Sequence, residues 1–463
     1  MKYSKQLFFL ALLFVFFIGS YAQDRVAQID SLFAPVTGKP AFNGNVLIAE
    51  KGNIIYQKSF GKADLEKNLP LNSESVFELA SVSKQFTAMG IMILKKQNKL
   101  SYDDSLRKFF PELPYHNITV LQLLQHTSGL PDYMPLFNEH WDSTKIAVNS
   151  DIIKLLSQYK PDTLFAPGAK WEYSNTGYAL LASIIEKVSG KKFGEFLRKN
   201  IFEPLGMKRT QVYCRRYENR KIDNYAYGYV MDKKTNKFVL PDSIAETAIL
   251  VYALDGIQGD GTVNSTTTDL LKWDRALYTE KLVTKKMMVE AFQPAKLNEG
   301  KTYGYGFGWS LGDIKSIGKI VTHTGGWPGY ATLIEREIEV DKTIIILQNM
   351  ETPRPSLINI RNILNGIKVE ASKEISVKVS KLQDYVGEFE LAPSFTITIT
   401  VEADKIFAQA TGQDKFELFS EKEDIFFLKV VEAKIKFIRD KDSKVSSIIL
   451  YQGGQEVEGK KIK

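Results

Sequence analysis

A serine and a lysine three residues apart, Ser81 and Lys84, stand directly before a long apolar run, residues 85–94. If this run is a helix, the two side chains lie one turn apart on the same face. Burial disfavours the charged form of a lysine, so its amine can take the proton of the neighbouring hydroxyl. The pair therefore predicts acyl transfer with the serine as nucleophile.

The bare Ser-x-x-Lys pattern is not specific. It occurs six times, beginning at Ser59, Ser81, Ser105, Ser157, Ser189 and Ser316. Only the segment after Ser81 is apolar almost all round, which is typical of a helix buried in a domain interior. The context of the pattern thus selects Ser81 as the candidate nucleophile.

A tyrosine and an asparagine two residues apart, Tyr173 and Asn175, follow the turn signal at residues 167–168 and precede a helical pattern. On an extended loop, side chains two apart point the same way. A phenol held beside Lys84 would be partly ionised and could relay protons, and the amide could bind a substrate carbonyl. In isolation this segment is more typical of an ordinary loop.

A third segment, His323, Thr324, Gly325 and Gly326, leaves a predicted strand at its edge. Glycine permits close approach of a substrate backbone, and an exposed strand edge can bind an extended peptide by strand addition. We interpret these four residues as substrate-binding candidates, together with Tyr133 on the expected cleft wall. Alone, His323 would be read as a turn histidine.

Composition bounds the possible functions. With 463 residues, 44% of them hydrophobic, the chain is long enough for two or three domains. The net charge of +7 is modest and no basic tract with interleaved aromatic residues occurs, so we expect no nucleic acid partner. The four histidines form no His-x-His pair and cysteines do not cluster, so we expect no metal and no other cofactor. The single cysteine, Cys214, excludes an internal disulfide.

Residues 1–22 are typical of a signal peptide. Lys2 and Lys5 precede an apolar run at residues 7–18, and Ser20-Tyr21-Ala22 resembles a cleavage site. The run is too short to span a bilayer. We expect an exported protein, periplasmic or secreted, with no membrane span after cleavage.

The order of secondary structure predicts the fold. Strand patterns occur at residues 45–50, 54–60, 305–310, 320–324, 330–335 and 343–348, with mostly helical patterns from 100 to 294 and a closing helix at 357–364. Strands at both ends of a helical middle predict an α/β domain, residues 23–370, whose sheet is assembled from both ends beside a helical insertion. Residues 376–463 alternate apolar and polar positions and predict a small all-β, barrel-like domain.

Three motifs together resemble those of the penicillin-recognising serine hydrolases, the superfamily of class C β-lactamases, DD-peptidases and related esterases. They are, in this order, Ser81-Val82-Ser83-Lys84, Tyr173-Ser174-Asn175 and His323-Thr324-Gly325. Accessory stretches at residues 123–132, 167–180, 202–207 and 259–266 are also similar, and the resemblance covers about residues 27–364. It implies an antiparallel sheet flanked by helices, with a helical subdomain.

The resemblance also implies roles for single residues. Ser81 would be the acylated nucleophile, and Lys84 and Tyr173 the acid/base pair. Asn175 would hold the acyl side chain, and the backbone N–H groups of Ser81 and Gly326 would form an oxyanion hole. The start of the C-terminal domain, residues 382–387, is similar to a lipocalin-like accessory domain.

The implied function is hydrolysis of an amide or ester through an acyl-enzyme, of the DD-peptidase, D-amino-acid peptidase or β-lactamase-related kind, without a cofactor. The implied partner is a small-molecule or peptide substrate, with peptidoglycan-derived peptides included, and the number of subunits stays open. Two alternatives remain, a small-substrate esterase and a non-catalytic penicillin- or peptidoglycan-binding sensor. An α/β-hydrolase is excluded, because no helical pattern follows the Gly-x-Ser-x-Gly match at residues 308–312.

The sequence departs from class C β-lactamases at His323, where they carry lysine. A lysine is a permanent cation for a substrate carboxylate, whereas histidine is only partly charged at neutral pH. Two hypotheses follow for His323: its cationic form binds a carboxylate, or its neutral ring shapes the strand edge and donates a hydrogen bond. The departure argues against an efficient β-lactamase.

We expect His126 to organise its loop and not to act as a catalyst.

Overall fold

The computed structural model describes residues 24–35, 38, 40–218, 220–367, 379–392, 395–411, 415–428, 433–452 and 455–463. The predicted signal peptide, residues 1–22, and the predicted domain boundary, residues 371–375, lie outside these ranges. The chain divides into two compact units, Pro35–Pro353 and a second one that joins the chain before Pro35 to Arg354–Lys463.

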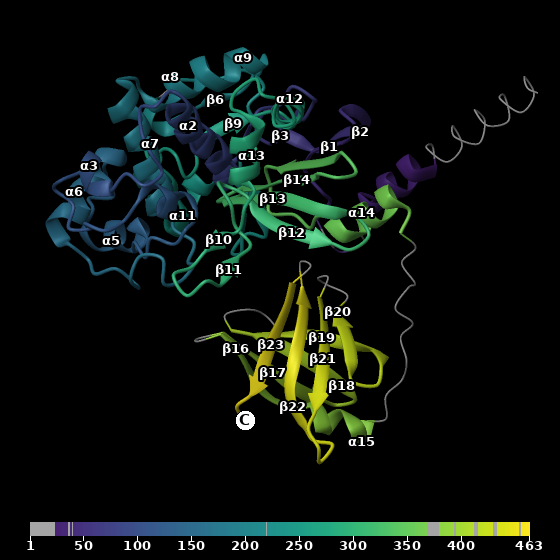
Figure 1. Ribbon diagram of the computed structural model, residues 1–463. Helices are drawn as coiled ribbons and strands as arrows, with labels where there is room; N and C mark the ends of the chain where they lie inside the picture. The colour runs from purple at the N-terminus through teal and green to yellow at the C-terminus, as the bar shows by residue number, and fades with distance from the viewer. Residues whose placement is uncertain are drawn as a thin grey trace, which may run out of the picture. The chain divides into compact units, whose positions relative to one another are not determined.

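The unit Pro35–Pro353 contains a six-stranded antiparallel sheet in the order β12-β13-β14-β15-β1-β2. The strands are β12 (Ser310–Ile314), β13 (Gly318–Trp327), β14 (Tyr330–Glu337), β15 (Lys342–Gln348), β1 (Gly44–Glu50) and β2 (Asn53–Phe60). The first strands of the chain thus pair with the last ones of the unit, and Ile48 lies opposite Ile344 (Figure 1). The prediction of one sheet assembled from both ends is confirmed.

One predicted strand is wrong. Residues 305–309 do not form a strand, Ser310 begins β12, and Tyr305 makes only an isolated bridge to Ser310. Glycines shape this segment: a Cβ at Gly306 would lie 2.1 Å from the carbonyl oxygen of Ala291, and Gly308 has a φ of +75°. Glycines that permit close backbone approach or positive φ are typical of a bend and not of a strand interior.

Helices occupy the middle of this unit, as predicted. They include α3 (Leu106–Phe109), α4 (Val120–Leu124), α5 (Tyr133–His140), α6 (Asn149–Tyr159), α7 (Asn175–Ser189), α8 (Phe193–Leu197), α9 (Glu203–Leu205), α10 (Arg215–Glu218), α11 (Ala245–Ala253), α12 (Thr267–Ala276) and α13 (Lys285–Ala291). The apolar run after Ser81 forms α2 (Lys84–Lys96), whose residues from Lys84 to Leu94 are all buried. Helix α2 packs against α7, and a Cβ at Gly90 would lie 2.7 Å from Ile185 Cδ1.

The sheet and the helices share one core. Strand β15 carries Ile344, Ile345, Ile346 and Leu347, all fully buried. Consecutive buried residues mark a strand that is covered on both faces. Helix α12 packs against β1 and β15 and covers one of these faces. The core thereby fixes the sheet from which β13 extends toward the predicted site.

The C-terminal strands form a closed antiparallel barrel, which confirms the predicted all-β domain. Its strands are β16 (Gly387–Ala392), β17 (Phe395–Glu402), β18 (Lys405–Ala410), β19 (Lys415–Lys422), β20 (Ile425–Leu428), β21 (Ala433–Arg439), β22 (Val445–Gln452) and β23 (Gln455–Lys461). The barrel closes where Phe389 of β16 lies opposite Lys461 of β23. Phe389, Phe426 and Phe437 are buried in its core.

Besides the short helix α15 (Val379–Leu382), two longer helices belong to the second unit. The predicted closing helix is present as α14 (Leu357–Asn365), and residues 24–32 also form a helix. Arg25 donates a hydrogen bond to the carbonyl oxygen of Leu364 over 3.2 Å. In the part of the chain that the structure describes, no helix is long and apolar enough to cross a membrane.

A buried ion pair joins the sheet to α12. Arg336 of β14 and Asp274 of α12 are 1% and 0% exposed, and Nε of the arginine lies 2.5 Å from Oδ1 of the aspartate. The second carboxylate oxygen accepts a hydrogen bond from Arg275 Nε over 2.6 Å. Removal of one partner would leave the other charge buried and unpaired.

We predict that Asp274→Ala lowers the free energy of unfolding by about 3–5 kcal/mol, because Arg336 would keep an uncompensated buried charge. Asp142→Ala serves as the control, since Asp142 is half exposed and pairs with Lys145 at the surface. Its expected loss is below about 1 kcal/mol. Urea unfolding followed by circular dichroism measures both, and equal losses would contradict the prediction.

Candidate active site

Ser81 lies in a short 3-10 turn, η1 (Ala80–Ser83), directly before α2. Ala80 has a φ of +47°, a left-handed conformation that costs an alanine about 1 kcal/mol or more. Ser81 is partly exposed, whereas its neighbours in the turn are buried. The Ser83 hydroxyl accepts a hydrogen bond from the N–H of Val263 over 3.0 Å. The strained turn is thus fixed to a neighbouring strand and leaves the Ser81 side chain accessible.

Lys84 is fully buried, and its amine contacts three oxygens. Nζ lies 3.1 Å from Ser81 Oγ, 2.9 Å from Asn175 Oδ1 and 2.8 Å from the carbonyl oxygen of Asp260. The structure therefore brings together the serine, the lysine and the asparagine that the sequence selects from positions up to 94 residues apart.

These three contacts satisfy the amine in both of its protonation states. A charged ammonium has three N–H groups, one for each oxygen. A neutral amine has two N–H groups, which suit Asn175 Oδ1 and the Asp260 carbonyl, and one lone pair that can accept the Ser81 proton. A proton can therefore pass between Ser81 and Lys84 without rearrangement of the partners.

Tyr173 places its ring next to this amine. Lys84 Nζ lies 4.9 Å from the ring centroid. The Tyr173 hydroxyl oxygen is buried and has no hydrogen-bond partner among the residues that the structure describes. A buried hydroxyl without a partner costs about 1–3 kcal/mol, and because Tyr173 lines the pocket at Ser81, its hydroxyl is available to a bound substrate.

His126 supports the loop that carries Tyr173. Their ring centroids are 4.3 Å apart. The N–H of Ser174 donates to His126 Nδ1 over 3.1 Å, and the N–H of Glu172 donates to the His126 carbonyl over 2.9 Å. Burial, together with the charge of Lys84, holds the pKa of His126 well below its usual range, so the ring is neutral. These contacts agree with the expected loop-organising role.

Asn175 is held by a residue that the sequence analysis did not single out. Its amide nitrogen Nδ2 donates to Asp132 Oδ2 over 3.0 Å, while its Oδ1 faces Lys84. Asp132 also accepts a hydrogen bond from the N–H of Met134 and so caps α5. An aspartate directly before a helical pattern is the usual signal for such a cap, and it could have identified Asp132.

Tyr133 follows Asp132 and is buried, with its hydroxyl donating to Asp260 Oδ2 over 2.9 Å. Burial and the neighbouring carboxylates hold the pKa of Tyr133 well above its usual range. The hydroxyl of Tyr133 therefore holds Asp260, whose carbonyl contacts Lys84. Because the hydroxyl is used in this way, the predicted substrate contact of Tyr133 rests on its ring.

The environment of His323 bears on its two hypotheses. Its Nε2 lies 2.9 Å from the hydroxyl of Tyr305, and its Nδ1 lies 2.6 Å from the carbonyl oxygen of Thr324. Burial, reinforced by the charge of Lys84, lowers the pKa of His323 to about 4. The ring is therefore neutral at pH 7 and both nitrogens are engaged. This favours the strand-shaping hypothesis, and it offers no cation for a substrate carboxylate.

Strand β13 has a free edge beside the site. Its partner β12 pairs only with residues 318–322, so among the described strands residues 323–327 pair with β14 alone. Thr324 and Gly326 are exposed there, and Gly325 is buried. A Cβ at Gly325 would lie 2.2 Å from the carbonyl oxygen of Leu79, so only glycine lets the strand approach the Ser81 turn this closely.

A pocket of about 120 Å³ opens at Ser81. It is lined by Glu78, Ala80, Ser81, Tyr133, Met134, Tyr173, Asn175, Tyr213, Leu254, Asp255, Ile257, Asp260, Gly261, Thr262, Gly326 and Trp327. Of the predicted site residues, Tyr133, Tyr173, Asn175 and Gly326 line it with Ser81. Lys84, His323, Thr324 and Gly325 do not, although Lys84 contacts Ser81 and Asn175 directly. Among the described residues, no cluster of His, Cys, Asp and Glu could hold a metal ion.

Comparison with known proteins gives the family. Residues 29–366 match the beta-lactamase family. The chain belongs to this family. Residues 371–461 match a domain of unknown function, DUF3471. A penicillin-binding protein of Bacillus subtilis (strain 168) is 43% identical over 451 residues, which are 95% of this chain and 100% of that protein.

Solved structures agree with this membership of the beta-lactamase family. An octameric penicillin-binding protein homologue from Pyrococcus abyssi has a TM-score of 0.64 and 25% identity, covering 96% of this chain and 100% of that one. A D-amino acid amidase from Ochrobactrum anthropi SV3, complexed with D-phenylalanine, has a TM-score of 0.57 and 25% identity, covering 75% and 96%. The protein is thus a serine hydrolase of the β-lactamase and penicillin-binding protein type.

The low pKa of His323 predicts a loss of stability in acid. The pKa is about 4 in the folded protein and about 6.5 in the unfolded chain, so the unfolded chain binds more protons between these values. The stabilisation is complete above pH 6.5 and declines as the pH falls toward 4. Between pH 7 and pH 5, His323→Asn should lose about 2 kcal/mol less stability than the wild type.

Urea unfolding of both proteins at pH 7 and pH 5 measures this difference. Groups distant from His323 titrate alike in the two proteins, so the comparison cancels their contribution to the pH dependence. The same pH dependence in wild type and variant would mean that His323 is not held neutral by the fold.

Proposed function

We propose that this protein is an exported hydrolase that cleaves an amide at a D-amino acid residue, in the manner of a D-amino-acid peptidase or DD-peptidase. The observation that carries the proposal is the contact of one buried amine, Lys84 Nζ, with both Ser81 Oγ and Asn175 Oδ1. This arrangement suits acyl transfer to Ser81.

The reaction begins with attack of Ser81 Oγ on the substrate carbonyl carbon. The Ser81 proton passes to Lys84, whose amine has a lone pair for it in the neutral state. The carbonyl oxygen becomes an oxyanion, which the N–H groups of Ser81 and Gly326 stabilise. Both residues line the pocket.

Collapse of the tetrahedral intermediate expels the leaving amine, which needs a proton. Tyr173 is the donor, because its hydroxyl is buried at the site and has no other partner among the described residues. The Lys84 ammonium then returns a proton to the tyrosine. Water repeats the same steps in reverse on the acyl-enzyme, releasing the acid and restoring Ser81.

The choice of a D-amino acid substrate rests on the comparisons and on charge. The related structure with D-phenylalanine is that of a D-amino acid amidase, and the 43% identical relative is a penicillin-binding protein. No lysine, arginine or histidine is among the residues that line the pocket. The way in which class C enzymes recognise β-lactams, with a cation for the substrate carboxylate, is therefore disfavoured.

We also propose export through residues 1–22 and a boundary between a hydrolase domain, residues 23–370, and a barrel domain, residues 376–463. The penicillin-binding relative supports export. The two family matches, which meet between residues 366 and 371, support the boundary.

We predict that Ser81→Ala abolishes covalent labelling by a fluorescent penicillin and by a fluorophosphonate probe, because the acylated oxygen is gone. Gel fluorescence measures the labelling, and circular dichroism checks that the fold is retained. Labelling of the variant at the wild-type level would place the nucleophile elsewhere, and absence of labelling in the wild type would favour a non-catalytic sensor.

We predict that Lys84→Ala and Tyr173→Phe each slow acylation by about 10²-fold or more, the scale of lost acid/base assistance. Tyr102→Phe is the matched control, since Tyr102 is also buried with an unpartnered hydroxyl but does not line the pocket. Its acylation rate should stay within about twofold of wild type. Single-turnover kinetics decide, and equal effects of the two tyrosine variants would remove Tyr173 from the mechanism.

We predict that amides of D-phenylalanine are hydrolysed at least about tenfold faster than those of L-phenylalanine, a difference of about 1.4 kcal/mol in transition-state binding. Initial rates with both enantiomers, a neutral ester and benzylpenicillin give the comparison. Fast turnover of the ester with no preference between enantiomers would favour the small-substrate esterase instead.

A further inference from the structure

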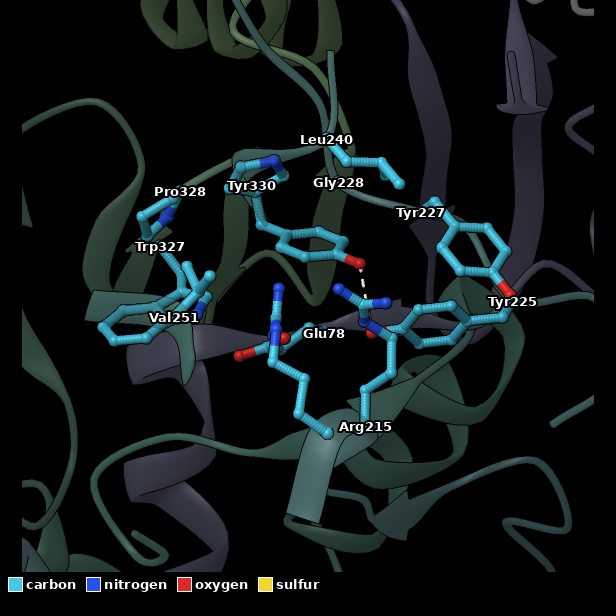
Figure 2. Close-up of a pocket in the computed structure, with 12 residues that line it drawn as sticks. Glu78, Arg215, Tyr225, Tyr227, Gly228, Leu240, Val251, Trp327, Pro328 and Tyr330 are labelled. Carbon is cyan, nitrogen blue, oxygen red and sulfur yellow. Dashed lines mark hydrogen bonds between the residues drawn. The ribbon is translucent and has the colours of Figure 1, made fainter. Parts of the chain in front are cut away.

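Glu78 is an acidic residue of the pocket wall that the proposed mechanism does not use. It lies three residues before Ser81 in β5 (Phe77–Glu78), which pairs with β9 (Val263–Ser265) and β9 in turn with β6 (Gln211–Val212). This pairing fixes its backbone. Its side chain lines both the pocket at Ser81 and a smaller neighbouring pocket, shown in Figure 2. Trp327 also lines both.

The side chains of the pocket at Ser81 that can carry a charge near pH 7 are all acidic. Its wall contains the carboxyl groups of Glu78, Asp255 and Asp260, and no basic side chain is among its lining residues. Lys84, the nearest base of the catalytic group, is fully buried behind this wall. The pocket is therefore suited to a positively charged group.

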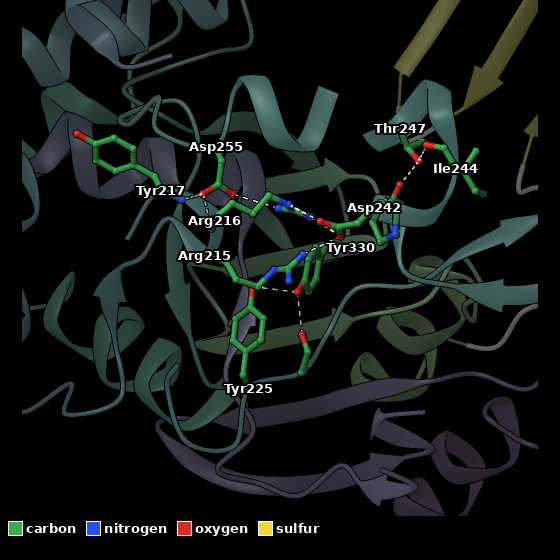
Figure 3. Close-up of polar contacts among 11 residues, drawn as sticks. Arg215, Arg216, Tyr217, Tyr225, Asp242, Ile244, Thr247, Asp255 and Tyr330 are labelled. Carbon is green, nitrogen blue, oxygen red and sulfur yellow. Dashed lines mark hydrogen bonds and ion pairs between the residues drawn. The ribbon is translucent and has the colours of Figure 1, made fainter. Parts of the chain in front are cut away.

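Two of the three carboxyl groups have other partners. Asp255 accepts hydrogen bonds from the N–H groups of Arg216 and Tyr217 and pairs with the Arg216 guanidinium over 3.1 Å (Figure 3). Asp260 accepts the hydroxyl of Tyr133. By contrast, no hydrogen bond or ion pair joins Glu78 to another side chain among the described residues. Its carboxyl group is the one left available to a ligand.

The arginines beside Glu78 are already balanced. Asp242 pairs with Arg216 over 2.7 Å and with Arg215 over 2.7 Å, and Asp255 pairs with Arg216. Two cations and two anions thus form one network, drawn in Figure 3. An ionised Glu78 adds one negative charge that this network does not neutralise.

The surroundings of Glu78 allow a bound ligand to change the ionisation of its carboxyl group. Burial raises the pKa of Glu78 to about 7, and Asp255 acts in the same direction, while Arg216 and Arg215 oppose them. The other titratable groups that face it are uncharged near pH 7: Tyr225, Tyr330 and Cys214, whose pKa values burial raises. A cation in the pocket would therefore favour ionisation of Glu78, and ionised Glu78 would favour the cation.

Aromatic side chains complete the environment. Trp327, Tyr213 and Tyr133 line the same pocket. Aromatic faces attract ammonium and quaternary ammonium groups, and such rings around one carboxylate are a usual way to recognise them. Asn175, which the family resemblance assigns to the acyl side chain, also lines this pocket, so the cation would belong to the acyl part of the substrate.

We propose that Glu78 is a specificity-determining residue that binds a positively charged ammonium group on the acyl part of the substrate. This inference rests on the proposed function, because it concerns substrates that acylate Ser81. It narrows the substrate class to acyl donors with a cationic group.

The test uses two p-nitrophenyl esters of the same shape. One carries the 4-(trimethylammonio)butanoyl group and the other the neutral 5,5-dimethylhexanoyl group, so they differ only in a fixed charge that does not titrate. The measured quantity is the ratio of kcat/KM for the cationic ester to that for the neutral ester. It is determined for wild type, for Glu78→Gln and for Glu299→Gln, whose parent carboxyl group is exposed and pairs with Lys301.

We expect the wild type to prefer the cationic ester and Glu78→Gln to lower the ratio by about tenfold or more, the effect of one lost charge contact. Glu299→Gln should leave the ratio within about twofold, which excludes a general effect of protein charge. In the wild type the ratio should rise from pH 6 to pH 8, as Glu78 ionises. It should stay flat in Glu78→Gln.

Equal ratios in wild type and Glu78→Gln would overturn the proposal, as would a preference of the wild type for the anionic glutarate monoester, which would indicate recognition by the arginines. If Glu78→Gln does not fold, the pH dependence of the wild-type ratio decides, and a flat profile overturns the proposal. Fluorophosphonate labelling distinguishes failure of the Glu78 proposal from failure of the proposed function. A labelled enzyme that shows no preference refutes only the role of Glu78, whereas absence of labelling refutes the proposed function.

Discussion

The site depends on the contacts of one buried amine. Lys84 Nζ meets oxygens from a 3-10 turn, from the start of α7 and from the backbone at Asp260. A buried amine is tolerated only if its hydrogen-bonding groups are satisfied, so these three segments have to converge. The surrounding groups serve this convergence. Asp132 orients Asn175, and Tyr133 holds Asp260.

Close packing of backbones supplies the rest of the geometry. Gly325 brings β13 against the turn that carries Ser81, and Ala80 accepts a positive φ so that the turn can present its serine. Neither feature gains stability by itself. Both are held by the buried sheet, whose central strand β15 is apolar on both faces. A rigid core thus supports a locally strained nucleophile.

The sequence allowed the candidate site residues Ser81, Lys84 and Asn175 to be selected because each stands in a local pattern. Ser81 and Lys84 precede an apolar helix, and Asn175 follows a turn and begins another helix. The pairing of the two ends of the chain in one sheet followed from the order of strand patterns. The strand predicted at residues 305–310 was wrong because Gly306 and Gly308 interrupt it, a signal that was present in the sequence. The neutrality of His323 could not be predicted, since it depends on burial and on Tyr305 in another segment. The contact of Lys84 with the backbone carbonyl of Asp260 could not be predicted either, because a backbone carbonyl is present at every residue.

The position of β1 between β2 and β15 has a consequence for biosynthesis. Because β1 precedes β15 by nearly 300 residues, the ribosome has made most of this unit before β1 can acquire its second neighbour. Contacts of such sequence separation form late in folding. A nascent or truncated chain that ends before β13 therefore contains Ser81 and Lys84 but lacks Gly326, which lines the same pocket. The pocket is complete only when the last strands have joined the sheet, so under the proposed mechanism an unfinished chain has no activity toward acyl donors.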